Sequence, residues 1–172
     1  TAAERAADYI LRTLYSKGSG LLHRYCKGEA GITAHLDDYS FMIWGLMELY
    51  QADFKEHYLL KAVELQDELC AHYSDESSGA FFSTHANAND LPLRPLEFHD
   101  GAIPSGNSVA MLNLLRLGSI TGRPDYDDRA QRIGRAFGAQ THRMPDAFCM
   151  LMCALEFETG PHPTIVIAGA RN

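Results

Sequence analysis

The strongest constraint on the fold is a regular alternation of two kinds of helical segment. Amphipathic segments, with apolar residues at helical spacing on one side and charges on the other, occupy residues 1–16, 54–74 and 124–140. Segments that are apolar nearly all round occupy residues 37–53, 106–120 and 146–157. The first kind is typical of helices with one side in water, and the second suits helices packed on most sides. The order outer, inner, outer, inner, outer, inner predicts an all-α array of about three helical hairpins.

The inner-to-outer hairpin occurs twice in the sequence. Residues 46–69 and 114–137 align without a gap. The matches are Leu49 with Leu117, Tyr58 with Tyr126, Lys61 with Arg129, Ala62 with Ala130 and Leu65 with Ile133. Apolar matches at helical spacing also arise by chance, but hairpins that repeat bury their faces on their neighbours. The repeat therefore predicts an open solenoid or a closed ring.

Composition excludes several classes of function. A hydrophobic share of 46% in 172 residues is enough for a buried core, and no segment has the length and polarity of a membrane span. A net charge of -7 lacks the basic stripe of a nucleic-acid-binding protein. The four cysteines, Cys26, Cys70, Cys149 and Cys153, form no C-x-x-C pair. They are typical of buried thiols in a reducing cytoplasm.

Titratable residues cluster where the chain enters each inner helix. His35, Asp37 and Asp38 precede the first, Glu97, His99 and Asp100 precede the second, and Asp146 precedes the third. The long link of residues 74–105 also contains "GAFFS", a short run with β character. Because links at one end of a helical array are common places for binding sites, the acids are expected to gather at one end.

The first cluster has a structural and a chemical interpretation. Asp37 is a natural N-cap for a helix that starts at Asp38, since its carboxylate can accept free amide donors. Capping does not explain a second carboxylate beside it and the imidazole of His35. Two carboxylates and an imidazole are what a sugar enzyme needs to give and take a proton, so Asp38 is a candidate acid or base. Tyr39, near the start of this helix, is a candidate for stacking on a sugar.

The second cluster, "EFHDGAIPSGNS", also has two interpretations. Gly101, Pro104 and Gly106 suit a turn. Ser105 or Asn107 can cap the following helix. His99 and Asp100 exceed what one turn needs, and together with Glu97 they are candidate ligand contacts. The amides at this helix start could also hold an anion or a sugar hydroxyl.

Metal and cofactor motifs are not found. His35 with Asp37 or Asp38 does not reach the spacing of a zinc site. The sequence contains no Walker loop, no G-x-G-x-x-G and no G-x-S-x-G. No metal and no cofactor are predicted.

Several stretches resemble a known family. "LDDYSF" and "DGAIPSGNS" are the most specific, and "SDESSGAFFS" and "HPTIVIAG" extend the similarity over nearly the whole chain. They resemble the helical region of the spermatogenesis-associated, thioredoxin-domain-containing family. The resemblance implies a thioredoxin-like domain followed by a six-hairpin α/α toroid, similar to N-acylglucosamine 2-epimerases and several glycosidases.

The resemblance also implies a domain division. Residues 1–163 would be later hairpins of the toroid and residues 164–172 a truncated strand, giving minor β structure at the C-terminal end. The thioredoxin-like domain would be absent from this chain. A partial ring leaves hairpin faces uncovered, so the missing remainder of the toroid is an expected partner, and self-association of the isolated chain is expected.

The resulting hypothesis is a carbohydrate-directed site with epimerase- or glycosidase-like acid/base chemistry. The candidate catalytic residues are Asp38, His99 and Asp100, and the candidate ligand contacts are His35, Asp37, Tyr39, Glu97, Ser105 and Asn107. The alternative is a non-catalytic ligand-binding or scaffold module that serves the thioredoxin-like domain. Fold alone does not decide between them.

Overall fold

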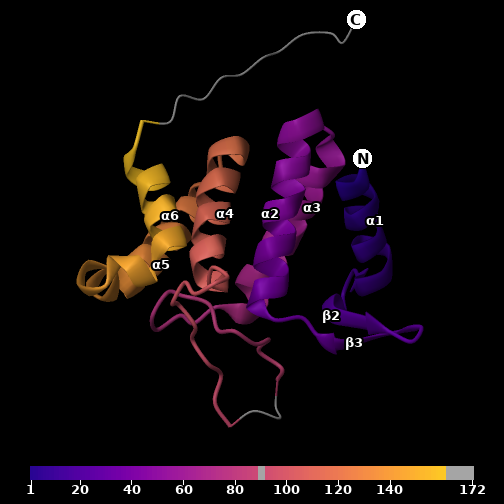
Figure 1. Ribbon diagram of the computed structural model, residues 1–172, viewed down its shortest axis with the longest axis horizontal. Coiled ribbons are helices and arrows are strands. Elements are labelled where there is room, and N and C mark those ends of the chain that lie inside the picture. Colours follow the sequence, from indigo (N-terminus) through magenta and orange to yellow (C-terminus); the bar gives the residue numbers. More distant parts are fainter. Residues whose placement is uncertain (89–91, 162–172) are drawn as a thin grey trace, which may run out of the picture.

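The computed structural model describes residues 1–88 and 92–161 and is predominantly helical (Figure 1). The helices are α1 (Ala2–Leu14), α2 (Leu36–Asp53), α3 (Glu56–Tyr73), α4 (Gly106–Thr121), α5 (Pro124–Arg143) and α6 (Cys149–Thr159), with a 3₁₀ turn η1 (Pro145–Ala147) before α6. The strands are β1 (Tyr15–Ser16), β2 (Gly20–Cys26) and β3 (Glu29–Thr33). All six predicted helices are confirmed. None of the described helices is long and apolar enough to span a membrane.

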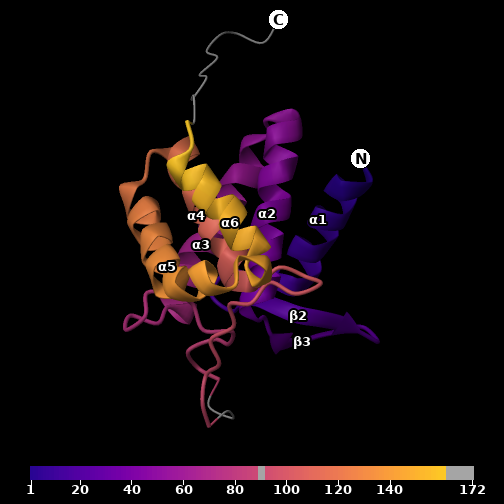
Figure 2. The ribbon, with the colours of Figure 1, turned by 60° about the vertical axis from the view of Figure 1, so that its left-hand side comes forward.

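The helices form two layers. Helices α2, α4 and α6 pack in a row, with α3 against α2 and α5 against α4, as Figures 1 and 2 show from two directions. The three inner helices begin at the same end of the molecule, where the β-strands and the long link also lie (Figure 1). This is the expected inner and outer order, and the fold class of a partial α/α toroid is confirmed.

The two hairpins of the repeat have matching geometry. Tyr58 and Tyr126 are each the third residue of their outer helix, and both are buried. The preceding inner helices both end on a residue in the left-handed conformation, Phe54 with φ +56° and Gly122 with φ +70°. Glycine adopts that conformation without strain, whereas phenylalanine does not. The inner helix of the second hairpin therefore ends with less backbone strain than that of the first.

Burial along the inner row is uneven. In α4 eleven residues are buried, from Gly106 to Gly118, because α4 has neighbours on both sides. In α6 only Leu151 and Ala154 are buried, although its sequence is equally apolar. The expectation that every inner helix is packed on most sides holds for α4 and not for α6. The reason is that, within the described residues, α6 lies at the end of the row.

The antiparallel strands β1, β2 and β3 were not predicted from the sequence. Strands β2 and β3 pair in the register Leu22 with Thr33 and Cys26 with Glu29. The turn between them is Lys27–Gly28, with φ of +52° and +89°. Positive φ at both positions is the geometry of a tight hairpin turn that matches strand twist. The strand that was predicted, residues 164–172, lies outside the described residues, and "GAFFS" contributes only an isolated bridge between Ser74 and Phe81.

Candidate functional site

Asp38 lies where the chain enters α2, a region called the first helix mouth; the entrances to α4 and α6 are the second and third mouths. It is the third residue of α2, and its Oδ2 accepts the backbone N–H of His35 at 2.8 Å. The same oxygen lies 2.8 Å from Nδ1 of His23, a residue of β2. Among the described residues Oδ1 of Asp38 has no hydrogen-bond partner. The local fold thus fixes the carboxylate through one oxygen and leaves the other available.

The helix start differs from the sequence-based interpretation in one respect. The N-cap is His35, and Asp37 lies inside the first turn of α2. Asp37 therefore does not cap its own helix. Its carboxylate lies close to Gly106 at the start of α4. A Cβ placed on Gly106 would lie 2.3 Å from Oδ1 of Asp37, so glycine is the residue that permits this close approach.

The surroundings of Asp37 raise the pKa of its carboxyl group above the usual value. Loss of water around its carboxyl raises the pKa, and the nearby negative charge of Glu97 raises it further. The backbone of Gly106 opposes the rise, and the charge of Asp38 adds to it. The residue still has exposed surface. The first mouth therefore contains one carboxyl with a raised pKa beside a second carboxylate that is held in a different environment.

These groups form the rim of an open pocket of about 570 Å³. Its polar lining residues are His23, Asp37 and Asp38. Its apolar lining comes from α1, β2, α2 and the long link, through Ile10, Leu14, Leu21, Leu22, Phe41, Met42 and Ile103. Among residues 1–88 and 92–161, no lysine or arginine lines it. A pocket with apolar walls and a few polar groups on one side is typical of small-molecule sites.

His23 is the lining residue that the sequence analysis missed. Its partner Asp38 is 15 residues away in the sequence. Its ring also meets that of His35, with centroids 5.2 Å apart and planes at 70°. The sequence signal for it is the run "GLLHRYC" followed by Lys27–Gly28. This pattern is compatible with a β-hairpin whose two-residue turn has glycine at its second position. A β-hairpin predicted at this place would put His23 next to the start of α2.

Asp100 lies apart from this pocket and binds helix starts instead. Its Oδ1 accepts the N–H of Ser105 at 2.8 Å. Its Oδ2 accepts the N–H groups of Met150 at 2.8 Å and Leu151 at 3.1 Å. Asp100 thereby joins the cap of α4 to the first turn of α6. Both oxygens serve backbone amides that the helices themselves leave unpaired.

Ser105 and Asn107 are structural in the same way. Ser105 is the N-cap of α4 and accepts the N–H of Ser108 at 3.2 Å, as predicted. Asn107 is buried and exchanges two hydrogen bonds of 2.9 Å with the backbone of Phe81. Its Nδ2 also donates to the carbonyl of Glu97 at 2.7 Å. Asn107 pins the long link to α4, and none of its polar atoms faces the pocket.

Tyr39 is buried in a polar network rather than placed for stacking. Its hydroxyl donates to Glu68 at 3.1 Å and accepts the N–H of Leu21 at 3.0 Å. Tyr15 donates to the other oxygen of Glu68 at 2.6 Å. Burial raises the pKa of Tyr39 to about 12. The network ties the β-strands to α2 and α3.

The remaining predicted residues lie around the mouths. His99 is exposed and packs on the rings of Phe98 and Phe148, with centroids 4.6 and 5.3 Å away. Glu97 acts on Asp37 through its charge. His99 and Asp100 are thus not brought together with Asp38 in the lining of one pocket. In the described parts of the chain, no three His, Cys, Asp or Glu residues are grouped as metal ligands.

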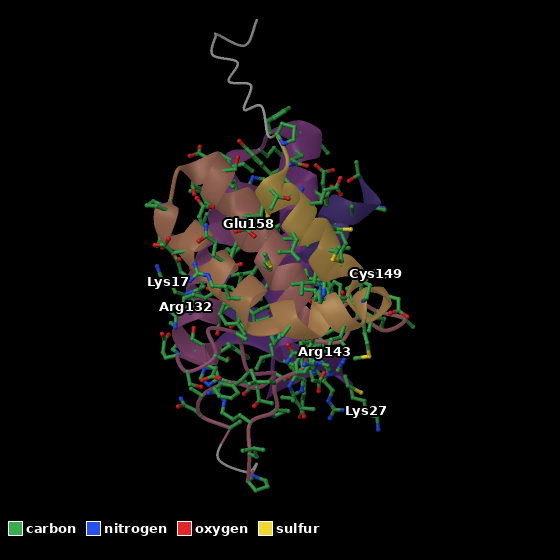
Figure 3. All side chains as sticks on the ribbon, turned by 90° about the vertical axis from the view of Figure 1, so that its left-hand side faces the viewer. Lys17, Lys27, Arg132, Arg143, Cys149 and Glu158 are labelled. Atoms are coloured by element: carbon green, nitrogen blue, oxygen red, sulfur yellow. The ribbon has the colours of Figure 1, made fainter. Side chains whose placement is uncertain are left out.

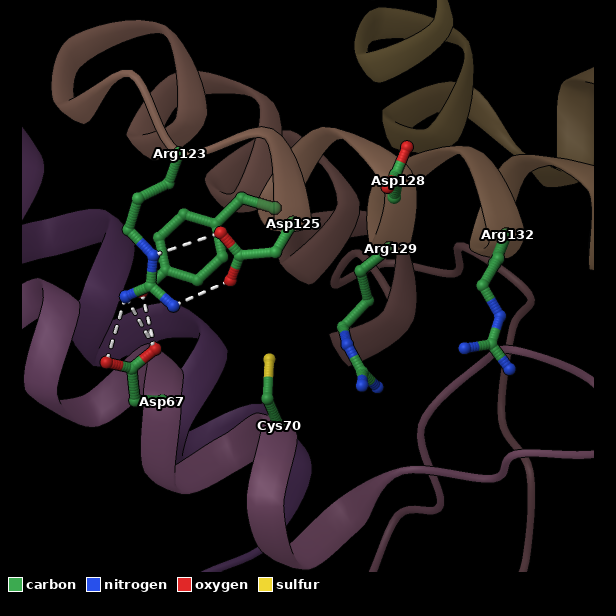
Figure 4. Close-up of a pocket in the computed structure, with 8 residues that line it drawn as sticks. Asp67, Cys70, Arg123, Asp125, Asp128, Arg129 and Arg132 are labelled. Carbon is green, nitrogen blue, oxygen red and sulfur yellow. Dashed lines mark hydrogen bonds and ion pairs between the residues drawn. The ribbon is translucent and has the colours of Figure 1, made fainter.

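A second, smaller pocket of about 220 Å³ lies between the outer helices α3 and α5. In Figure 4, Arg123 is held between Asp67 and Asp125, with contacts of 2.9 and 2.7 Å. Cys70 points into the pocket, and burial raises the pKa of its thiol. Since Asp128 also lines it beside Arg129 and Arg132, its charges balance. The pocket is best explained as packing and ion pairs between two outer helices.

Comparison with known proteins gives relatives over nearly the whole chain. No family model matches the sequence. Spermatogenesis-associated protein 20 of Rattus norvegicus is 35% identical over 179 aligned residues, which include 98% of this chain. The human protein of that name is also 35% identical, over 99% of this chain. The chain is a homologue of spermatogenesis-associated protein 20. It spans about a quarter of the length of these relatives, 23% in both cases.

A solved structure supports the fold. A family 76 glycoside hydrolase from a bovine Bacteroides thetaiotaomicron strain superposes with a TM-score of 0.60 at 19% sequence identity. The match includes 77% of this chain and 28% of the hydrolase chain. That hydrolase is an α/α toroid, so the homologue of spermatogenesis-associated protein 20 has the arrangement of part of such a ring.

Proposed function

We propose that the pocket at the mouth of α2 binds a neutral carbohydrate and acts on it with the two carboxyl groups of Asp37 and Asp38. The observation that carries the proposal is the contrast between these neighbours on one rim. Asp37 has a raised pKa, which suits a proton donor. Asp38 is held through Oδ2 and has Oδ1 available for water or substrate. Pairs of carboxyl groups in contrasting environments are the usual acid and base of glycoside hydrolysis.

The lining favours an uncharged ligand. Asp37 and Asp38 lie on the rim, and Glu97 is close enough to act on Asp37. In the part of the chain that the structure describes, no basic residue other than His23 lines the pocket. A sugar phosphate or a uronic acid would meet like charge without a compensating cation, which costs binding energy. Neutral sugars offer apolar ring faces to Phe41 and Met42 and hydroxyls to the rim. The hydrolase fold of the structural neighbour is consistent with this class of ligand.

Hydrolysis is favoured over epimerisation by the placement of the histidines. Epimerisation by removal and return of a proton needs two bases on opposite sides of the substrate. His23 and His35 instead touch each other, and His23 is the one histidine among the described residues that lines the pocket. A scaffold function is the second candidate, because Asp100, Ser105 and Asn107 are all engaged in internal hydrogen bonds. Under that hypothesis the acids of the mouths would serve only to cap helices.

A thermal-shift screen with neutral mono- and oligosaccharides tests the proposal. A ligand present at a hundred times its dissociation constant stabilises a protein by about 2.7 kcal/mol, which raises the melting temperature by roughly 5 to 11 °C for a domain of this size. The shift is expected for the wild type and to be lost in Asp38→Asn and reduced in His23→Gln. His99→Gln is the matched control, since His99 is exposed and does not line the pocket. No shift with any sugar, or equal shifts in all variants, would favour the scaffold.

A further inference from the structure

The hairpin of β2 and β3 is irregular at one position beside the pocket. Regular cross-strand pairs flank that position on both sides: Leu22 with Thr33, and Arg24 with Gly31. By this register Ile32 is the counterpart of His23, but the pair is missing from the ladder, although the structure describes both residues. The hairpin lies beside the start of α2 (Figure 1), and Figure 3 shows Lys27, in its turn, below the helices at the same end of the molecule.

The pairing is interrupted where the backbone of Ile32 is left-handed, with φ +63°. That conformation is strained for a residue branched at Cβ, and strain of this kind is concentrated at functional sites. Burial does not compensate for it, since 52% of Ile32 is exposed. On the opposite strand Leu21, Leu22 and His23 all line the pocket. Consecutive side chains of a regular strand point to opposite faces, so the irregularity accompanies the placement of His23 at the pocket.

The side chain of His23 reaches the first turn of α2. Its Nδ1 lies 2.8 Å from Oδ2 of Asp38, the oxygen that also accepts the backbone N–H of His35. An ionised carboxylate only accepts hydrogen bonds, so Nδ1 of His23 carries the hydrogen. The ring of His35 packs edge-on against the ring of His23, with centroids 5.2 Å apart. Asp38 and His35 therefore hold this imidazole in one orientation and one tautomer.

The second ring nitrogen of His23 is then available to a ligand. When Nδ1 of a neutral imidazole carries the hydrogen, Nε2 has a free lone pair and accepts a hydrogen bond. No described residue is hydrogen-bonded to Nε2 of His23, and 44% of this side chain is exposed. His23 also lines the pocket. Among the groups of a neutral sugar, a hydroxyl can donate to such an acceptor.

We propose that His23 is the positioning residue of this pocket. Its Nδ1–H fixes the carboxylate of Asp38, and its Nε2 accepts a hydrogen bond from a hydroxyl group of the bound sugar. The left-handed backbone of Ile32 keeps the imidazole at this place. The contact with sugar rests on the proposed carbohydrate function, whereas the tautomer is a property of the free protein. The two can therefore fail separately.

Nitrogen NMR of the imidazole rings in the free protein tests the positioning. In mildly alkaline buffer His23 is expected to be the Nδ1–H tautomer. Asp38→Ala removes the acceptor and should abolish that preference, because the hydrogen bond selects the tautomer. His57, exposed on α3, is the internal reference and should not change. An Nε2–H tautomer of His23 in the wild type would overturn the proposal, and so would a tautomer that is unchanged in Asp38→Ala. The wild-type spectrum alone decides the point if the variant does not fold.

Two conservative substitutions separate the two nitrogens. The side-chain amide of asparagine lies as many bonds from the backbone as Nδ1, and that of glutamine lies as many as Nε2. His23→Asn can therefore keep the donor to Asp38, and His23→Gln can keep the acceptor for sugar.

Isothermal titration with a panel of neutral oligosaccharides measures the effect of each substitution. We expect affinity to fall by about tenfold or more in His23→Ala and by intermediate factors in His23→Asn and His23→Gln. His99→Gln, outside the pocket lining, should bind like the wild type. Wild-type affinity in His23→Ala would overturn the contact with sugar. If the wild type binds no oligosaccharide, that contact fails together with the proposed function, while the NMR result still decides the positioning of Asp38.

Discussion

Asp100 and Met150 lie 50 residues apart in sequence, and the Oδ2 atom of one accepts the backbone N–H of the other at 2.8 Å. This contact joins the link before α4 to the first turn of α6. Together with the contact between Asp37 and Gly106, it holds the starts of the inner helices in register. The acidic residues at this end of the helical array therefore stabilise the fold, in addition to any chemical role.

Replacing Asp100 should be costly. Asp100→Ala removes the acceptor of three backbone N–H groups, those of Ser105, Met150 and Leu151. Loss of a capping carboxylate typically costs about 1 kcal/mol, and two helix starts are affected here, so a loss of roughly 2 kcal/mol or more is expected. Urea denaturation measures it. The matched variant Asp128→Ala, at an exposed position of α5, should change stability little. Equal effects of the two substitutions would contradict the account.

Gly106 should not tolerate a side chain. A Cβ there would lie 2.3 Å from Oδ1 of Asp37 and 2.7 Å from Cγ of Leu36. We expect Gly106→Ala to destabilise the protein by about 2 kcal/mol or more. Gly138, in α5, has no atom within 4 Å of the corresponding position. Gly138→Ala should therefore stabilise by roughly 0.5 to 1 kcal/mol, because alanine is the better helix former. Thermal unfolding of both variants gives the comparison, and shifts of the same sign would count against it.

Removing the hydroxyl of Tyr39 should lower the stability of the protein. In Tyr39→Phe the buried N–H of Leu21 loses its acceptor and Glu68 loses a donor. An unpaired buried amide costs roughly 1 to 3 kcal/mol. Tyr9→Phe is the control, since Tyr9 is 49% exposed and keeps its ring contact with Tyr25. Denaturation midpoints for the two variants should differ clearly. A Tyr39→Phe protein as stable as the wild type would show that water replaces the hydroxyl.

The raised pKa of Asp37 gives a pH-dependent prediction. Because the folded-state pKa lies above the unfolded value, ionisation of Asp37 lowers stability as pH rises from the unfolded pKa, about 3.9, through the folded one. Asp37→Asn removes that charge and nearly preserves the size and shape of the side chain. The variant should be more stable than the wild type at pH 7, by less than about 1 kcal/mol because water screens the site.

The gain from Asp37→Asn should shrink as pH falls through the folded pKa and reach its minimum when both proteins carry a neutral side chain. Thermal unfolding at a series of pH values measures this. Glu97→Gln should give a smaller gain of the same sign, because Glu97 contributes to the rise after desolvation. A variant that is less stable than the wild type at pH 7, with a deficit that grows with pH, would contradict the assignment.

The sequence allowed the helical architecture to be predicted because its periodicities are strong and local. The apolar run from Val109 to Leu117 predicts an inner helix, and the charged face of residues 124–140 predicts an outer one. The β-hairpin was missed since β2 has only Leu21 buried and most of its residues are exposed. A strand with little core contact has a weak hydrophobic pattern.

The candidate site was predicted in part. The neighbouring acids Asp37 and Asp38 could be located because they precede a helix, and they do lie on one pocket rim. The role of Asp100 could not be read in advance, because its partners Met150 and Leu151 are distant in the sequence and are backbone groups without a sequence signal. His23 was missed for the related reason that its position depends on the hairpin.

Isothermal titration of the folded protein with the neutral oligosaccharide that gives the largest thermal shift tests the central claim most directly. The account predicts saturable binding to the wild type and to the control Asp128→Asn. It predicts binding at least tenfold weaker to Asp38→Asn, a variant that can keep the hydrogen bond from His35 and lacks the carboxylate. Equal affinity of Asp38→Asn and the wild type, or no binding of any neutral oligosaccharide, would contradict it.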